Sequence, residues 1–377
     1  MAGIFAVLIV PLWMAVWAGG MTLGSPFGTV DWHIHEMLFG YTSAVIAGFL
    51  FTAIPNWTGR MPMRGWPLMV LAGLWVTGRL AVAGKFGLGP VGIMVLDCAF
   101  LAAVLAIVIR EIISGRNWGN LKVVVPVGVY LAADVTFHLE AMWRGQADSG
   151  RRLGFAMVVM LILLIGGRII PSFTRNWLTR RAREGGRKPG DMLAPVGKFD
   201  AASLGMTLLA LMLWVVLPES LIAASGMMLV AILQGVRLMR WRGWRTLASP
   251  LLVMLHVAFG FLPCGLFAVG LGGFGLLPAA TGLHLLGNGG VGGMTLAVMM
   301  RVSLGHTGRA LEVGPVLTGA FVCVALAALV RASASAEIAL WLAAVLWTAG
   351  FAAFLVLYAP VLVTENAGRR LPNPKAG

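Results

Sequence analysis

The chain has 377 residues, of which 59% are hydrophobic and only 11% are charged, and its mean hydropathy is +0.90. Because a soluble domain carries about 25% charged residues, this composition excludes an ordinary soluble protein. The formal net charge of +14 would suggest nucleic-acid binding in a soluble chain. Here the basic residues lie in loops between apolar runs, so they indicate membrane topology, and no nucleic-acid partner is expected.

The three cysteines, Cys98, Cys264 and Cys323, each lie in an apolar run, and none forms a C-x-x-C motif. This pattern argues against a disulfide framework, a zinc knuckle and covalently attached c-type haem. The first apolar run has no basic region before it and no clear cleavage site, so we expect a spanning helix rather than a signal peptide.

Apolar runs of about 20 residues predict helices that cross the bilayer, since a lipid-embedded segment must satisfy its own backbone hydrogen bonds. The expected spans are 4–22, 34–54, 67–84, 90–109, 122–142, 153–171, 200–217, 220–236, 249–270, 281–300, 312–331 and 338–362. The predicted fold is therefore all-α: one polytopic, lipid-embedded bundle of about twelve spans over residues 1–377. A basic loop, 174–199, is expected to join two halves of about six helices, 1–173 and 200–377.

Basic residues gather in the loops that follow the even-numbered spans. Alternate loops such as 23–33, 218–219 and 271–280 carry neither Lys nor Arg, and the loop 143–152 is an exception, with three arginines. Because positive loops stay in the cytoplasm, we predict that both termini are cytoplasmic.

The six histidines are the main candidates for chemistry, because ionisable residues within a bilayer are costly and usually functional. Imidazole is a good ligand for haem iron and for copper. The alternative is that each is an ordinary polar residue bonded to a carbonyl at a helix end. The predicted topology places four of them near the outer face and two nearer the cytoplasm; in chain order the six are His33, His35, His138, His256, His284 and His306.

We predict that His33 or His35 converges with His138 and His284 on one metal centre in the outer half of the membrane. His256 and His306 are left for a second centre. His33 and His35 are two residues apart, about 200° around a helix. Either the chain is unwound before His35, or these two histidines have different roles.

Several charged residues lie at the same depth as the outer histidines. Asp134 is four residues before His138 and shares its helix face, so it can hold the second nitrogen of a ligating histidine. Asp134 and Glu36 are candidate catalytic groups that would supply protons. Arg79 and Asp97 either pair with each other, or Arg79 binds a haem propionate.

The tenth span is rich in glycine, which either permits close helix packing or leaves room for a flat macrocycle. On the cytoplasmic side, Arg168 and Arg301 lie at helix ends, where they can form salt bridges or bind carboxylates. Both arginines are therefore candidate cofactor-binding residues.

Several motifs closely resemble the NnrS family. They are His33-Ile34-His35-Glu36-Met37-Leu38-Phe39-Gly40, Asn56-Trp57-Thr58-Gly59, Gly167-Arg168-Ile169-Ile170-Pro171-Ser172-Phe173-Thr174, Leu255-His256, Gly293-Met294-Thr295-Leu296-Ala297-Val298-Met299 through Arg301, and Gly305-His306-Thr307-Gly308-Arg309. The resemblance runs from about residue 30 to 310. After His284 the chain reads Leu285-Leu286-Gly287-Asn288-Gly289, where the family usually has Ala-Leu-Thr-Val-Gly, and Asn288 is counted among the candidate cofactor-binding residues.

The resemblance implies a multi-pass protein of the bacterial inner membrane that carries haem b and copper and acts in the response to nitric oxide. It implies defence against nitrosative stress, often beside denitrification, with nitric oxide or nitrosyl-iron species as partner and an electron donor that the sequence does not name. Catalytic detoxification of nitric oxide and cofactor binding without turnover both stay open. The alternative is a polytopic transporter of a metal ion or small anion without redox chemistry, because two halves of six spans also suit that class.

Overall fold

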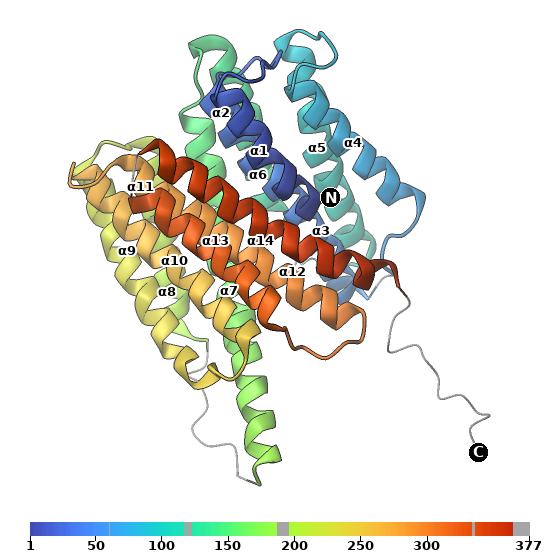
Figure 1. Cartoon of the computed structure of the whole chain (residues 1–377), viewed down its shortest axis with the longest axis vertical. Helices are drawn as coiled ribbons and strands as arrows, with labels where there is room; N and C mark the ends of the chain where they lie inside the picture. The colour runs from blue at the N-terminus through green and yellow to red at the C-terminus, as the bar shows by residue number, and fades with distance from the viewer. Residues whose placement is uncertain (60, 117, 119–122, 187–195, 334–335, 365–377) are drawn as a thin grey trace. The chain divides into compact units, whose positions relative to one another are not determined.

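The computed structural model describes residues 1–59, 61–116, 118, 123–186, 196–333 and 336–364, and these residues form helices and no strand (Figure 1). In the first part of the chain the helices are α1 (Ala2–Trp17), α2 (Thr29–His35), η1 (Glu36–Tyr41), α3 (Thr42–Thr58), α4 (Trp66–Val82), α5 (Pro90–Ser114), α6 (Val124–Arg144) and α7 (Ser149–Glu184). The second part holds α8 (Lys198–Val216), α9 (Leu221–Arg240), η3 (Gly243–Thr246), α10 (Pro250–Gly273), α11 (Ala279–His284), η4 (Leu285–Gly292), α12 (Gly293–His306), α13 (Pro315–Ser333) and α14 (Glu337–Val363).

Two long helices each contain a π-helical segment in the middle. The segments η1 and η4 are π-helices that continue α2 into α3 and α11 into α12. Ten of the described helices are long and apolar enough to cross a membrane, and α1 and α4 are shorter apolar helices of 16 and 17 residues. The prediction of an all-α polytopic membrane protein is confirmed.

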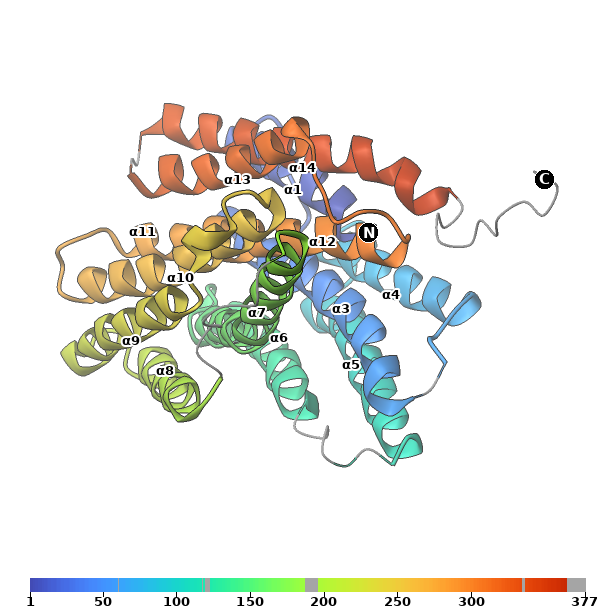
Figure 2. The ribbon, with the colours of Figure 1, turned by 90° about the horizontal axis from the view of Figure 1, so that it is seen from below.

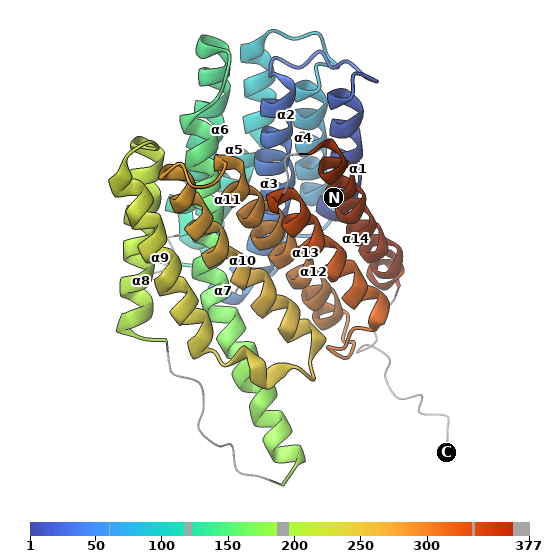
Figure 3. The same ribbon diagram turned by 60° about the vertical axis from the view of Figure 1, so that its left-hand side comes forward.

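Helix α7 is longer than its hydropathy indicates. It runs on to Glu184, so residues 174–184 of the predicted loop are helical, and residues 187–195 of that loop lie outside the described part of the chain. Arginine is a good helix former, and the helix extension is supported by an ion pair one turn apart, with 3.5 Å between Arg180 Nε and Glu184 Oε1. The helix ends before Gly186, which has a φ of +65°. Figure 3 shows the last turns of α7 reaching past the ends of α9 and α10.

The chain divides into two compact units, Met1–Val158 and Val159–Gly377, and the boundary falls within α7, ahead of the loop that the sequence indicated as the joint. In the first unit, α5 packs against α3, α4 and α6 (Figure 2). In the second unit, α9 packs against both α8 and α10, and α13 runs beside α14 (Figure 1).

The glycine-rich helix of the second unit is used for close packing. A Cβ atom added at Gly289 would overlap the ring of Phe261, and one added at Gly292 would overlap the ring of Trp347. Because neighbouring side chains already fill these glycine faces, packing explains them, and they do not provide room for a macrocycle.

Candidate metal centre

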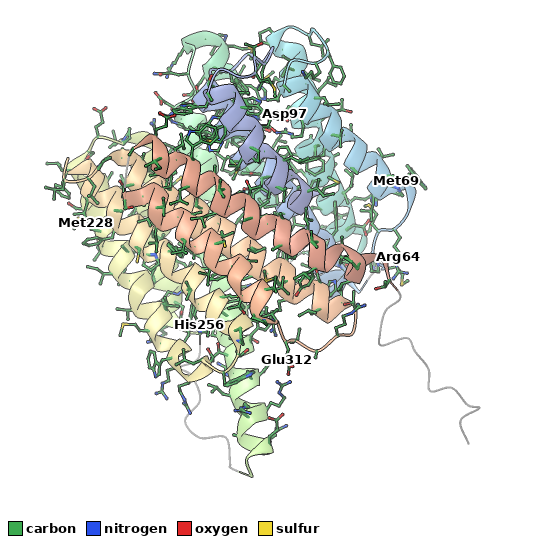
Figure 4. The ribbon with its side chains drawn as sticks, viewed as in Figure 1. Arg64, Met69, Asp97, Met228, His256 and Glu312 are labelled. Atoms are coloured by element: carbon green, nitrogen blue, oxygen red, sulfur yellow. The ribbon has the colours of Figure 1, made fainter. Side chains whose placement is uncertain are left out.

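Four helices of the first unit direct polar side chains into one apolar interior. His35 ends α2, Arg79 lies on α4, Asp97 and Cys98 lie on α5, and Asp134 and His138 lie one turn apart on α6. All but Arg79 are buried, and Asp97 is labelled among these helices in Figure 4.

The π-helix η1 follows His35 directly. Its wider turn leaves carbonyl groups that an α-helix would bond internally, and buried carbonyls need donors. Three side chains supply them: Thr42 Oγ1 donates to Met37 O at 3.0 Å, Trp75 Nε1 donates to Gly40 O at 3.0 Å, and Tyr130 donates to Leu38 O. The donors from α4 and α6 therefore stabilise the turn that follows His35.

Two imidazoles and two carboxylates meet at the centre of this unit. His35 Nε2 lies 3.0 Å from Asp97 Oδ2 and 3.1 Å from Asp134 Oδ1, and His138 Nε2 lies 2.9 Å from the same Asp97 oxygen. One ligand atom from each of the four residues lies within 4.8 Å of the other three. One metal ion can therefore be bound by all four residues, since metal–nitrogen and metal–oxygen bonds are about 2 Å long. We call these four residues the His/Asp cluster.

Arg79 and Glu36 adjoin the His/Asp cluster. The Arg79 guanidinium donates to Asp97 Oδ1 and, at 2.8 Å, to Glu36 Oε1. Glu36 Oε1 also lies 3.4 Å from Nδ1 of His35. The predicted pairing of Arg79 with Asp97 is therefore present, and Glu36 is next to the cluster, where it was expected to act as a proton donor.

Aromatic rings enclose the His/Asp cluster and exclude water from it. The ring centroids of Phe27, Phe39 and Phe137 lie 4.9, 5.3 and 5.1 Å from that of His35, and all three phenylalanines are buried. Because charges interact more strongly where water is excluded, this enclosure strengthens every electrostatic contact within the cluster.

The two neighbouring histidines of the first unit have different roles. The α2 helix is regular through His35, and the ring of His33 stacks on Trp13 of α1, with centroids 4.2 Å apart. Of the two, only His35 joins the His/Asp cluster. His138 joins it as predicted, and Asp134 comes closer to His35, at 3.1 Å, than to His138 on its own helix, at 4.0 Å.

The other candidate histidines lie in the second unit. Nδ1 of His256 is 2.8 Å from Leu252 O, and Nδ1 of His284 is 2.7 Å from Ala280 O. A carbonyl oxygen only accepts, so each Nδ1 carries the hydrogen and each Nε2 has a lone pair. His306 is the exposed last residue of α12. The convergence of His284 with His35 and His138 stays a prediction.

The remaining candidate cofactor-binding residues are spread over the second unit. Arg168 is exposed on α7, and Asn288 is half-buried in η4. The Arg301 guanidinium lies over the ring of Phe173, with its central carbon 3.7 Å from the ring centroid. Their roles in cofactor binding stay predictions.

Sequence reasoning missed one member of the His/Asp cluster and one side chain that contacts it. It assigned Asp97 only to Arg79, although its second carboxylate oxygen contacts both histidines. It assigned no role to Cys98, whose Sγ lies 3.7 Å from Asp134 Oδ2. The sequence did contain a signal for both residues: Asp97 and Cys98 are adjacent in an apolar run, so they are two potential metal ligands at the same depth in the membrane.

A protein-family model matches this chain over almost its full length. The family model described as NnrS protein matches residues 1–365. No curated protein and no solved structure matches the chain. The match covers nearly the whole chain, including every residue of the His/Asp cluster and both π-helices, and the chain therefore belongs to the NnrS family.

Proposed function

We propose that this membrane protein binds copper and haem b and handles nitric oxide or nitrosyl-iron species in nitrosative-stress defence in the bacterial inner membrane. The observation that carries the proposal is the buried His/Asp cluster, whose four ligand atoms lie within 4.8 Å of one another. The NnrS family resemblance supplies the expected metals and the expected substrate.

The charges of the His/Asp cluster favour a divalent cation. Asp97, Asp134 and Glu36 are three buried carboxylates, and Arg79 is the one cation that contacts them among the described ion pairs. With neutral imidazoles the formal charge of this group is −2. Uncompensated buried charge is costly, and a divalent metal ion would cancel it.

The donor set suits an isolated transition metal and does not suit a haem. Imidazole nitrogen with carboxylate oxygen is a donor set for copper, iron or zinc. A haem between His35 and His138 would need empty space around the iron for the macrocycle. The carboxylates of Asp97 and Asp134 lie within 3.1 Å of His35 Nε2 and occupy that space. Copper is therefore proposed for this cluster.

Haem b fits better at His256. His256 Nδ1 is held by Leu252 O, and a metal-bound histidine typically donates its other N–H in this way. The residue lines a groove of about 420 Å³ whose other lining side chains are apolar. A Cβ at Gly243 would lie 2.5 Å from Cδ2 of His256, so glycine at this position lets the η3 backbone pack directly against the imidazole and hold it in place. To bind iron, His256 Nε2 would release its 3.4 Å contact with Thr174 Oγ1.

The residues around the copper centre are suited to a small, uncharged substrate. Nitric oxide partitions into lipid and needs no polar channel, and bound copper would supply a coordination site for it. Glu36 contacts both His35 and Arg79, so it is the group best placed to pass a proton to the centre. Arg79 holds the carboxylates of Glu36 and Asp97 in fixed positions.

Metal analysis combined with optical spectroscopy tests both assignments on the purified full-length protein. We expect wild type to contain copper and a b-type haem. His138→Ala is expected to lose copper and keep the haem spectrum, and His256→Ala the reverse. Wild type that contains no transition metal after expression with copper and haem supply would contradict the proposal.

A transporter of a metal ion or small anion is the second candidate. The observation that favours it is the same group of buried ionisable residues, because such groups also form proton relays in transporters. Consumption of nitric oxide by wild type, lost in His138→Ala, supports the first candidate. Metal uptake into vesicles without a haem or copper spectrum supports the second.

A further inference from the structure

The connection between α3 and α4 contains two methionines separated by a proline, Met61-Pro62-Met63, in non-helical backbone. Proline fixes its own φ near −65° and restricts the residue before it to extended conformations. The Met61-Pro62-Met63 segment is therefore stiff.

Both methionines line one cavity of about 160 Å³ beside the ends of α3 and α5. The cavity is also lined by Thr58 of α3 and by Arg110 and Glu111 of α5. Met61 is 79% exposed. An incoming ion can therefore reach this thioether directly.

We propose that Met61 and Met63 form a binding site for Cu(I), with the Glu111 carboxylate as a third ligand. Thioether sulfur is a soft donor that selects Cu(I) over divalent metals. The Glu111 side chain is only 15% exposed and lies beside Arg110, with 2.7 Å between Arg110 Nη2 and Glu111 Oε1. A carboxylate has two oxygens and several acceptor sites, so it can contact more than one partner at once.

This site is separate from the His/Asp cluster. Glu111 and Asp97 are both on α5, fourteen residues apart, which is about 21 Å at a rise of 1.5 Å per residue. The chemistry differs too, because the cluster offers nitrogen and oxygen ligands and the loop offers sulfur. The Cu(I) site therefore goes beyond the proposed function and can be tested independently of it.

The first test is an anaerobic titration of Cu(I) against a colorimetric Cu(I) chelator, with the full-length protein in detergent. The test variant is Met61→Leu/Met63→Leu, and the control is Met69→Leu. Met69 is 74% exposed on α4 (Figure 4) and does not line the cavity. Methionine and leucine have similar volumes, so neither change should disturb folding.

We expect wild type and the Met69 control to bind one Cu(I) equivalent that the double variant binds at least tenfold more weakly. Equal Cu(I) binding by all three proteins would overturn the proposal. An equal loss in the Met69 control would also overturn it, since that result would mean non-specific binding to exposed thioethers.

Oxidation footprinting gives a second, residue-resolved test with Ag(I) as the probe. We expect Ag(I) to protect Met61 and Met63 from conversion to the sulfoxide, and to leave Met69 unprotected. The protection should persist in His138→Ala, because that residue belongs to the His/Asp cluster. Equal oxidation of Met61 and Met63 with and without Ag(I), or loss of protection in His138→Ala, would contradict a separate thioether site.

Discussion

The Asp97→Asn substitution tests the structure of the His/Asp cluster most directly. The Asp97 side chain is fully buried, and its two oxygens contact Arg79, His35 and His138. Asparagine has nearly the same shape, so packing is retained. What changes is the charge: Arg79 loses one of its two carboxylate partners, and the cluster loses an anionic ligand.

The expected magnitude follows from these contacts. Removing one partner of a buried ion pair costs about 3–5 kcal/mol. Arg79 keeps Glu36 at 2.8 Å, so we expect a loss near 3 kcal/mol in the free energy of unfolding of the metal-free protein. Altering the groups around a metal ligand lowers affinity by about 10–100-fold. Losing an anionic ligand should exceed that range, so we expect metal affinity to fall by more than about 100-fold, or about 2.7 kcal/mol.

Two measurements check these values: unfolding in mixed detergent, followed by helix content, and competition titration for the metal. Asp148→Asn is the matched control, because Asp148 also pairs with an arginine, Arg151, but at the partly exposed start of α7. An exposed pair contributes only about 0–1 kcal/mol. Equal effects of Asp97→Asn and Asp148→Asn on stability, or wild-type metal affinity in Asp97→Asn, would refute the assignment of Asp97 to the centre.

Two further predictions rest on the described contacts, and a third rests on the distribution of basic residues among the loops. His35→Ala should remove the metal from the first unit, whereas His33→Ala should leave it in place, as measured by metal content per protein; the reverse order would contradict the stacking of His33 outside the cluster. Gly167→Ala should lower the free energy of unfolding by about 3 kcal/mol, because the added Cβ would overlap the buried Arg237 guanidinium and disturb its ion pair. Gly205→Ala, with nothing within 4 Å of the added Cβ, is its control and should have little effect, so equal unfolding curves for the two variants would refute this reasoning. Reporter fusions should place the C-terminus in the cytoplasm, and a periplasmic C-terminus would contradict the topology drawn from the basic loops.

The helices were predictable because an apolar segment in lipid must satisfy its own backbone hydrogen bonds, which a helix does. Each apolar run in the sequence corresponds to a helix in the described residues, including the ten that are long enough to span a membrane. Hydropathy indicates only where the chain leaves the lipid, so the sixth span was predicted to end near residue 171. Helix α7 continues to Glu184, because the segment after the span is rich in arginine, which favours helix. The π-helices were not predictable, because their extra residues depend on donors such as Trp75 that are distant in sequence.

The candidate site was only partly predictable, because its geometry depends on contacts between residues that are far apart in the sequence. His35 and His138 were identified because ionisable residues stand out in apolar runs. The choice of His35 over His33 depends on which helix face meets α5 and α6, and the sequence gives only their 200° separation. Asp97 was assigned to one partner because a linear pattern does not show that both oxygens of one carboxylate are used.

The π-helix after His35 has a consequence for how this protein can vary among its relatives. A helix with i→i+5 bonds holds one more residue than an α-helix over the same rise. Deleting one residue of Glu36–Tyr41 would restore α-helical spacing without turning the rest of α3, and the carbonyls that Trp75 and Tyr130 contact would return to bonds within the helix. We therefore expect relatives that keep Trp75 and Tyr130 also to keep six residues between His35 and Thr42, and relatives that lose one of these six residues to lose the two donors as well.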